Sequence, residues 1–344
     1  MNTILKEDIE EFTLPEDLIE ALRNSVVVVT GATGLIGSMF VRCIHSLRIG
    51  VRFILPVRNP AKAALMYDDM EDLSIAITDL NPEDLLKSDF NCDFIVHCAS
   101  PTDGTYMSSH PVETFNTAVE YTKVLLEYCR NHHVKGMVYL SSIEYYGQIF
   151  NDDPVTEDMM GYIDHSLARN SYALGKQASE YLIFAYADEY GVPAKTARLT
   201  QTFGAGISPD DKRVFAQFAR SVIAGEKIML HTQGRSAKPY CYLTDCISAL
   251  VYILVKGKNG EAYNVATPST YVTIRELAEL FGTFSDIENP VCNDFSSHHD
   301  YAPETRVNMD STKLIDLGWR PRFPLKYMVR RLIDYLRASN EEQS

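Results

Sequence analysis

The segment VVVVTGATGLIGSMF, residues 26–40, decides the fold. Its four consecutive valines predict a buried strand, and apolar residues over 35–48 recur at the spacing of a helix. Gly31 permits a tight turn out of the strand, Gly34 lets the backbone approach a pyrophosphate, and Gly37 lets the helix pack close to the strand. Because the glycines lie between a strand and a helix, the segment predicts a dinucleotide site at the helix N-terminus.

The rest of the chain alternates further strands with helices. Such alternation implies right-handed parallel crossovers, so we expect an α/β fold with a doubly wound parallel sheet of the Rossmann type. After about residue 205 the segments become shorter and richer in loops, which indicates a smaller mixed α/β lobe over the carboxyl edge of the sheet. The further strands are expected at 51–57, 73–79, 92–100, 136–142 and 194–200, and the long helices at about 111–131 and 171–190.

These patterns divide the chain into three parts. Residues 1–24 are expected to form an acidic helical extension, and residues 25–204 the dinucleotide-binding Rossmann domain. Residues 205–338 are expected to form mainly a substrate lobe, with some return to the Rossmann domain.

Composition and charge exclude several classes of protein. The chain of 344 residues carries a formal net charge of −14 without a block of Lys or Arg, which excludes nucleic acid as a partner because phosphate contacts need clustered positive charge. No apolar run is long enough to span a bilayer, and the first 24 residues lack the apolar core of a signal peptide. The seven cysteines are scattered and the nine histidines form no HExxH, so we expect reduced thiols, a cytoplasmic protein and no metal site.

The ends of the second and third strands bear on the choice of cofactor. A site for NAD places a carboxylate after the second strand, where it bonds the ribose hydroxyls. The sequence ILPVRNP offers none and offers Arg58 instead, whose charge suits a 2′-phosphate. Arg58 therefore favours NADP, although NAD stays open and an exposed loop arginine is the plain alternative. Asp79, at the end of the third strand, is placed to reach the adenine or to cap the following helix.

A second group of residues indicates proton transfer. Tyr172 and Lys176 in SYALGKQ lie four apart, on one face of the expected helix. Ser142 ends the fifth strand, at the same edge of the sheet. A neighbouring ammonium lowers the pKa of a phenol, so a Tyr–Lys pair of this kind serves as a proton relay.

Several longer stretches resemble one known superfamily. TGATGLIG, HCAS, SSIEYYG and Tyr172-x-x-x-Lys176 are similar to the extended short-chain dehydrogenase/reductases, whose members mostly act on nucleotide sugars. The resemblance covers nearly all of residues 25–335, including YCYLTD at 240–245. Within the superfamily, HCASP, YMSSHPVET, GYIDHSLARNSYALGKQ and TFGAGISPDDKRVFAQF are most similar to UDP-glucuronate decarboxylases.

The resemblance implies a mechanism and a set of contacts. Tyr172 would take the proton of the sugar 4-hydroxyl, with hydride passing to a tightly bound nicotinamide that later returns it. Lys176 would hold the ribose, Ser142 would bond the same sugar oxygen, and Glu144 would transfer a proton beside C5. The implied cofactor contacts are Gly31, Thr33, Gly34, Leu35, Ile36, Gly37, Arg58, Asp79, Leu80, Ala99, Ser100, Tyr172 and Lys176, and the implied substrate contacts are Arg169, Gln201, Arg213, Lys238 and Tyr242.

The sequence also departs from the decarboxylase pattern. Ala118 and Gln201 stand where those enzymes usually carry Asn, and Lys238 stands where they carry an arginine for the diphosphate. Ile143 stands where dTDP-glucose 4,6-dehydratases carry an acid beside the Glu. An epimerase or a 4,6-dehydratase therefore stays open, and so does a non-catalytic nucleotide-binding protein. The resemblance further implies a homodimer through the helices near 111–131 and 171–190.

Overall fold

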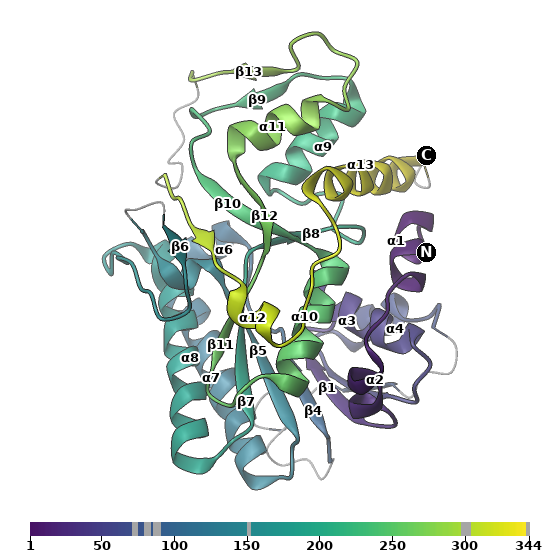
Figure 1. Cartoon of the computed structure of the whole chain (residues 1–344), viewed down its shortest axis with the longest axis vertical. Helices are drawn as coiled ribbons and strands as arrows, with labels where there is room; N and C mark the ends of the chain where they lie inside the picture. Colours follow the sequence, from purple (N-terminus) through teal and green to yellow (C-terminus); the bar gives the residue numbers. More distant parts are fainter. Residues whose placement is uncertain (71–74, 79–83, 85–90, 150–152, 297–303, 342–344) are drawn as a thin grey trace.

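A seven-stranded parallel sheet forms the centre of the computed structural model (Figure 1). The structure describes the chain except for residues 71–74, 79–83, 85–90, 150–152, 297–303 and 342–344. The strand order is β11-β7-β5-β4-β1-β2-β3, which confirms the expected doubly wound topology because the chain starts centrally and winds to both edges. The strands are β1 Val26–Thr30, β2 Arg52–Pro56, β3 Ile75–Thr78, β4 Phe94–His97, β5 Gly136–Ser142, β7 Ala194–Leu199 and β11 Ala262–Val265.

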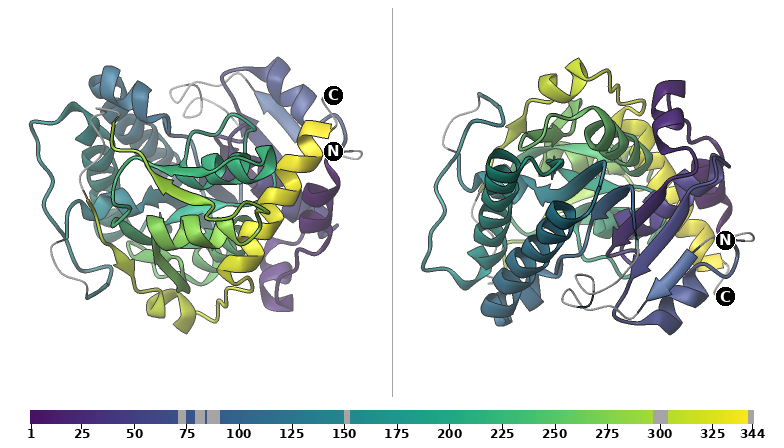
Figure 2. Two further views of the ribbon diagram at one scale, coloured as in Figure 1. Left: turned by 90° about the horizontal axis from the view of Figure 1, so that it is seen from above. Right: turned by 90° about the horizontal axis from the view of Figure 1, so that it is seen from below.

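Helices cover both faces of this sheet because its central strands, such as β1 and β4, are apolar on both sides. In β1, Val27 and Val29 face a core shared with α3 (Leu35–Ser46) and α10 (Leu243–Lys256). Val28 faces the opposite way, into a core shared with α7 (Pro111–Asn131) and α8 (Ser171–Tyr190). Figure 2 shows α7 and α8 side by side on one face of the sheet, with bounds that match the expected helices.

The pair α7 and α8 packs closely around small residues. Ala118 on α7 is buried, and a Cβ added to Gly175 on α8 would lie 3.2 Å from the Ala118 Cβ. The Ala118 carbonyl accepts hydrogen bonds from the Thr122 hydroxyl at 2.7 Å and the Ser179 hydroxyl at 3.0 Å. The departure at residue 118 therefore has a structural consequence, since an asparagine side chain would meet α8.

The first 24 residues form two helices that pack against the rest of the chain, and their expected role as an acidic extension stays a prediction. They form α1 (Thr3–Glu10) and α2 (Glu16–Leu22), and Ile9, Leu18 and Leu22 are buried in the core of the sheet's α3 side. Figure 1 shows α1 between α3 and α13 (Leu325–Glu341). Residues 1–24 therefore link α3, the helix that follows the glycine turn, to α13.

A smaller mixed region lies beyond the carboxyl edge of the large sheet, as expected. Its three-stranded sheet has the order β12-β10-β8, with β10 parallel to β8 and antiparallel to β12. The chain then returns to the large sheet through α10 and β11, while the expected boundary at residue 204 stays a prediction. The elements of this region are β8 Gln201–Phe203, α9 Val214–Ala224, β9 Ile228–Leu230, β10 Ala237–Tyr242, β12 Thr267–Thr273, α11 Ile274–Gly282 and β13 Val291–Asn293.

The remaining short elements connect these layers. They are α4 Pro60–Met66, α6 Gly104–Ser109, η1 Ile143–Tyr146, β6 Pro154–Val155, η2 Ala168–Asn170, β14 Asn308–Met309 and α12 Thr312–Asp316. Within the described ranges, no helix is long and apolar enough to cross a membrane. The same part of the chain holds no group of three or more His, Cys, Asp or Glu side chains placed to bind a metal ion.

Candidate active site

The turn between β1 and α3 has the shape of a phosphate cradle. Gly31 has a φ of +67°, and a Cβ there would lie 2.8 Å from the Ala99 backbone nitrogen. A Cβ on Gly37 would lie 2.4 Å from the Gly31 carbonyl oxygen. Gly34 is exposed and precedes α3 without a side-chain cap, so the first N–H groups of α3 are open to an anion. The turn therefore fits a dinucleotide pyrophosphate.

The other expected cofactor contacts surround this turn. Ala99 follows β4, and its N–H donates to the Thr30 hydroxyl at 3.2 Å. Arg58 is exposed just beyond β2, within electrostatic reach of Tyr106 on α6. Thr33, Leu35, Ile36 and Ser100 are half-buried along the same edge, whereas Asp79 and Leu80 lie outside the described residues. The contacts of these residues with a cofactor stay predictions.

Tyr172 and Lys176 lie one turn apart on α8 and face the end of β5. The Lys176 side chain is almost fully buried, and its Nζ donates to the Leu140 carbonyl at 2.7 Å. The same Nζ lies 5.3 Å from the centroid of the Tyr172 ring. Ser142, the last residue of β5, hydrogen-bonds the Tyr172 side chain. The structure thus brings the three expected relay residues together.

The electrostatics of the relay differ from the simple expectation. Burial raises the pKa of Tyr172 above its usual value, the Glu144 charge raises it further, and the Ser142 hydrogen bond lowers it. Burial lowers the pKa of Lys176 to about 7, and the nearby Glu180 raises it. The Tyr172 pKa is therefore raised rather than lowered, because burial and the Glu144 charge outweigh the Ser142 hydrogen bond. Before a substrate binds, Tyr172 is a neutral phenol.

Charged groups from three other elements converge beside Tyr172. Glu144 on η1 is exposed, and its N–H donates to the Ser142 hydroxyl at 3.2 Å. Burial lowers the pKa of Lys238 on β10, the Glu144 charge raises it, and the Arg169 charge lowers it again. These mutual effects place one carboxylate and two cations within electrostatic reach of one another. The expected catalytic acid and two expected substrate contacts therefore share one region.

Two further expected substrate contacts are already engaged within the chain. The Arg213 guanidinium holds Asp211, with Nε 3.0 Å from either carboxylate oxygen, and donates to the Thr202 carbonyl at 3.1 Å. Tyr242 is fully buried, and its hydroxyl donates to the Asp8 carboxylate. The role of Tyr242 as a substrate contact stays a prediction, and strand alternation in β10 gave no sign that Asp8 of α1 would accept from its hydroxyl. Gln201 is half-buried on β8 and stays a prediction.

Sequence reasoning missed a buried ion pair beneath the relay. Arg198 on β7 donates three hydrogen bonds to Glu180 on α8, from Nε to the two carboxylate oxygens at 3.3 and 3.0 Å and from Nη2 at 2.9 Å. The Ser141 hydroxyl also donates to Glu180. Two signals in the sequence could have revealed this pair: Glu180 continues the four-residue spacing of Tyr172 and Lys176, and Arg198 interrupts the apolar strand AKTARLT.

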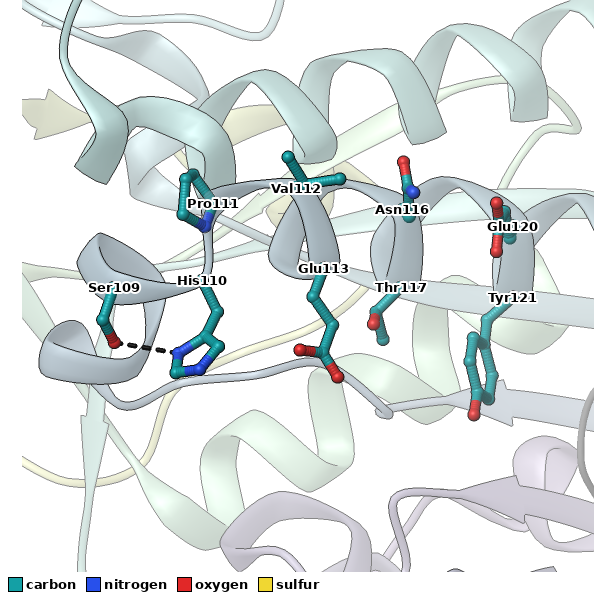
Figure 3. Close-up of a pocket in the computed structure, with 9 residues that line it drawn as sticks. All are labelled: Ser109, His110, Pro111, Val112, Glu113, Asn116, Thr117, Glu120 and Tyr121. Carbon is teal, nitrogen blue, oxygen red and sulfur yellow. Dashed lines mark hydrogen bonds between the residues drawn. The ribbon is translucent and has the colours of Figure 1, made fainter.

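A hollow of about 560 Å³ lies along α7, away from the relay side chains. The residues that line this hollow begin with Ser109 at the end of α6 and continue along α7 to Tyr121. Figure 3 shows His110, Glu113 and Tyr121 on one side of α7. The Ser109 hydroxyl and the His110 ring lie 2.9 Å apart at its end. None of the relay residues lines this hollow, so it is not the place where the expected chemistry would occur.

The fold is of the Rossmann type, and Ser142, Tyr172 and Lys176 lie together at the carboxyl edge of its large sheet. Residues 27–266 match the family described as the NAD dependent epimerase/dehydratase family, and the chain belongs to that family. It is 27% identical over 267 residues to a trifunctional UDP-glucose 4,6-dehydratase, 3,5-epimerase and reductase of Arabidopsis thaliana, covering 73% of this chain and 37% of that protein.

Two further likenesses show how wide the family is. UDP-glucuronic acid decarboxylase 1 of Danio rerio is 27% identical over 259 residues, covering 73% of this chain and 59% of that protein. The match thus spans well under two thirds of either relative. A crystal structure of UDP-glucose 4-epimerase from Thermotoga maritima superposes with a TM-score of 0.77 at 21% identity, covering 92% of this chain and 99% of the other. That likeness concerns the fold alone.

Proposed function

We propose that the protein oxidises a nucleotide sugar transiently at C4 and decarboxylates a nucleotide-linked uronic acid. The observation that carries this proposal is the convergence of Tyr172, Ser142 and Glu144 with two cations at the carboxyl edge of the sheet. The name of the zebrafish relative, a UDP-glucuronic acid decarboxylase, supports this choice of substrate.

The first step requires a proton acceptor beside the sugar 4-hydroxyl. Tyr172 is that acceptor, and Ser142 holds the same oxygen while the proton moves. A nicotinamide dinucleotide held at the glycine turn would supply an acceptor for the C4 hydride and a donor for its return. Lys176 stays buried against Leu140, where its ammonium favours loss of the phenolic proton despite the raised pKa of Tyr172. Exposed Arg58 supports NADP as the cofactor.

The second step follows from the position of the new ketone. A ketone at C4 lies β to the C6 carboxylate, so the C5–C6 bond breaks, CO₂ leaves and the electron pair is held as an enolate. Lys238 and Arg169 offer the positive charge that stabilises the enolate. Glu144 is the group beside Tyr172 that directs a proton to C5.

The side chain at residue 143 bears on the dehydratase alternative. Ile143 is 6% exposed and packs in a small apolar core with Tyr146 and Val155. Ile143 presents no acid to a substrate. The resemblance described above implies that a dehydratase of the dTDP-glucose type carries an acid at this position. This packing supports decarboxylation over dehydration.

The test combines two substrates with two variants. Purified protein with UDP-glucuronate is expected to release CO₂, whereas UDP-glucose is expected to react poorly. Glu144→Gln keeps the size of the side chain and removes its acid–base capacity, so CO₂ release should fall by roughly 10²–10⁴-fold with the cofactor still bound. Tyr172→Phe should stop reduction of the cofactor altogether. Conversion of a neutral nucleotide hexose, with no CO₂ from any uronic acid, would overturn the proposal.

We also propose that the protein is a homodimer through α7 and α8. Tyr181 and Phe184 on α8 are 68% and 53% exposed, and Val112 on α7 is 72% exposed. Large apolar side chains gathered on two adjacent helices are typical of a subunit interface. The test of the homodimer is the molecular mass of the protein in solution.

A further inference from the structure

The buried pair of Glu180 and Arg198 lies directly behind the relay and has no assigned role. Glu180 is 8% exposed and Arg198 is 3% exposed. The Arg198 guanidinium lies 3.5 Å from the centroid of the Tyr145 ring, and its Nη1 donates to the Glu157 carbonyl at 2.8 Å. An ion pair so far from water is expensive to form, and replacing it by apolar residues often costs nothing in stability. Its presence beside an active site therefore invites a reason other than stability.

The contacts of Glu180 tie the catalytic helix to the catalytic strand. Three consecutive residues of β5 meet three residues of α8 that are four apart. The Leu140 carbonyl binds Lys176, the Ser141 hydroxyl binds Glu180, and the Ser142 hydroxyl binds Tyr172. Glu180 is thus one of three links that fix the helix and strand in register.

Glu180 is also the source of negative charge for Lys176. The other titratable groups that face Lys176 are Tyr172 on α8, Tyr139 on β5, His97 at the end of β4 and Cys98 just after it. Burial keeps each of them neutral, since it raises the pKa of the phenols and of the thiol and lowers that of His97 to about 3. Both oxygens of Glu180 accept from the Arg198 guanidinium, which is the geometry of an ionised carboxylate.

We propose that Glu180 is a positioning residue, anchored by Arg198 and Ser141, that holds Lys176 in its charged form and in register with the end of β5. Arg198 is needed because a lone carboxylate at this depth would take up a proton. Ser141 is needed because its hydroxyl orients the Glu180 carboxylate toward β5. The Leu140 carbonyl that accepts from Lys176 lies on the same strand. The proposal rests on the proposed function only where it concerns turnover.

The test measures the protonation of Lys176 directly and separately from turnover. Glu180→Gln keeps the shape of the side chain and removes its charge, so the pKa of Lys176 should fall by one unit or more, which is about a tenfold change in protonation. The readout is the pH dependence of the Lys176 side-chain resonance in protein labelled with ¹³C-lysine, assigned with Lys176→Met. Ile183→Ala, on the same helix and fully buried, is the matched destabilising control and should leave this pKa unchanged.

The second readout is the pH profile of cofactor reduction in a single turnover with substrate. In Glu180→Gln its alkaline limb should move to lower pH, because the ammonium is lost earlier, and Ser141→Ala should move it less in the same direction. An unchanged Lys176 pKa in both Glu180→Gln and Ser141→Ala would overturn the proposal. If no sugar nucleotide reduces the cofactor in the unaltered protein, the proposed function fails, while the resonance still decides the role of Glu180.

Discussion

Replacing Gly31 by alanine tests the phosphate cradle, because a second glycine offers a control with nearly the same backbone. Gly31 has a φ of +67° and Gly225, at the end of α9, has a φ of +66°. An alanine pays about 1–2 kcal/mol at either position for the left-handed conformation. At Gly225 the new Cβ meets nothing within 4 Å, so no further loss is expected.

At Gly31 the new Cβ would meet backbone atoms of Cys98 and Ala99, the two residues that follow β4. The nearest atoms are the Ala99 nitrogen at 2.8 Å, the Cys98 carbonyl carbon at 2.9 Å and the Ala99 Cα at 3.0 Å. Backbone gives way less easily than a side chain, so overpacking adds about 1–3 kcal/mol and the total loss is about 2–5 kcal/mol. A protein whose stability lies in the middle or upper part of the ordinary range of about 5–15 kcal/mol still folds after this loss.

Two measurements on Gly31→Ala and Gly225→Ala decide the matter. Unfolding in urea should show the larger loss for Gly31→Ala, and calorimetric titration with NAD and NADP should show lost dinucleotide binding in that variant alone. Equal stability and equal binding for the two variants would refute the reasoning, because the close approach of the turn to β4 would then have no effect on either property.

Three further predictions concern other parts of the chain. Arg58→Ala should weaken NADP binding by about 1.5–3 kcal/mol, or roughly 10–150-fold, and leave NAD binding nearly unchanged by titration, since only a 2′-phosphate uses the charge. Burial raises the pKa of Asp245 from 3.8 to about 6, so its contribution to stability is complete below pH 3.8 and is lost as the pH rises through 6. Asp245→Asn should therefore gain about 2.4 kcal/mol relative to the unaltered protein between pH 4 and pH 7 in urea unfolding. Phe184→Asp should halve the mass measured by light scattering if α8 forms the subunit interface, and an unchanged mass would exclude that interface.

The large sheet could be predicted because its pattern is local. The valines at 26–29 and the strand GMVYLSS at 136–142 are apolar on both faces, which only a covered parallel sheet explains. The relay was likewise predictable, since Tyr172 and Lys176 owe their proximity to one turn of one helix. Each of these inferences needed no more than neighbouring residues.

The features that the sequence did not reveal depend on contacts between distant segments. Tyr242 lies on a strand that also carries Lys238, and only the presence of α1 decides that its hydroxyl meets Asp8. The pair of Glu180 and Arg198 joins a helix to a strand across the sheet, and burial of that pair depends on both. The raised pKa of Tyr172 has the same origin, because the sequence does not reveal how much water surrounds a side chain.

The position of α1 has a consequence for the order of events during synthesis. Asp8 binds Arg331, with Nε 3.1 Å from the carboxylate, although 323 residues separate them. At about 5–20 residues per second, the ribosome makes Arg331 roughly 16–65 s after Asp8. During that interval the Asp8 carboxylate lacks the Arg331 guanidinium, whereas Ile9 can already pack on α3. Although α1 is made long before α13, it is therefore among the last helices to complete its contacts, and a chain that lacks α13 leaves the Asp8 side of α1 without Arg331.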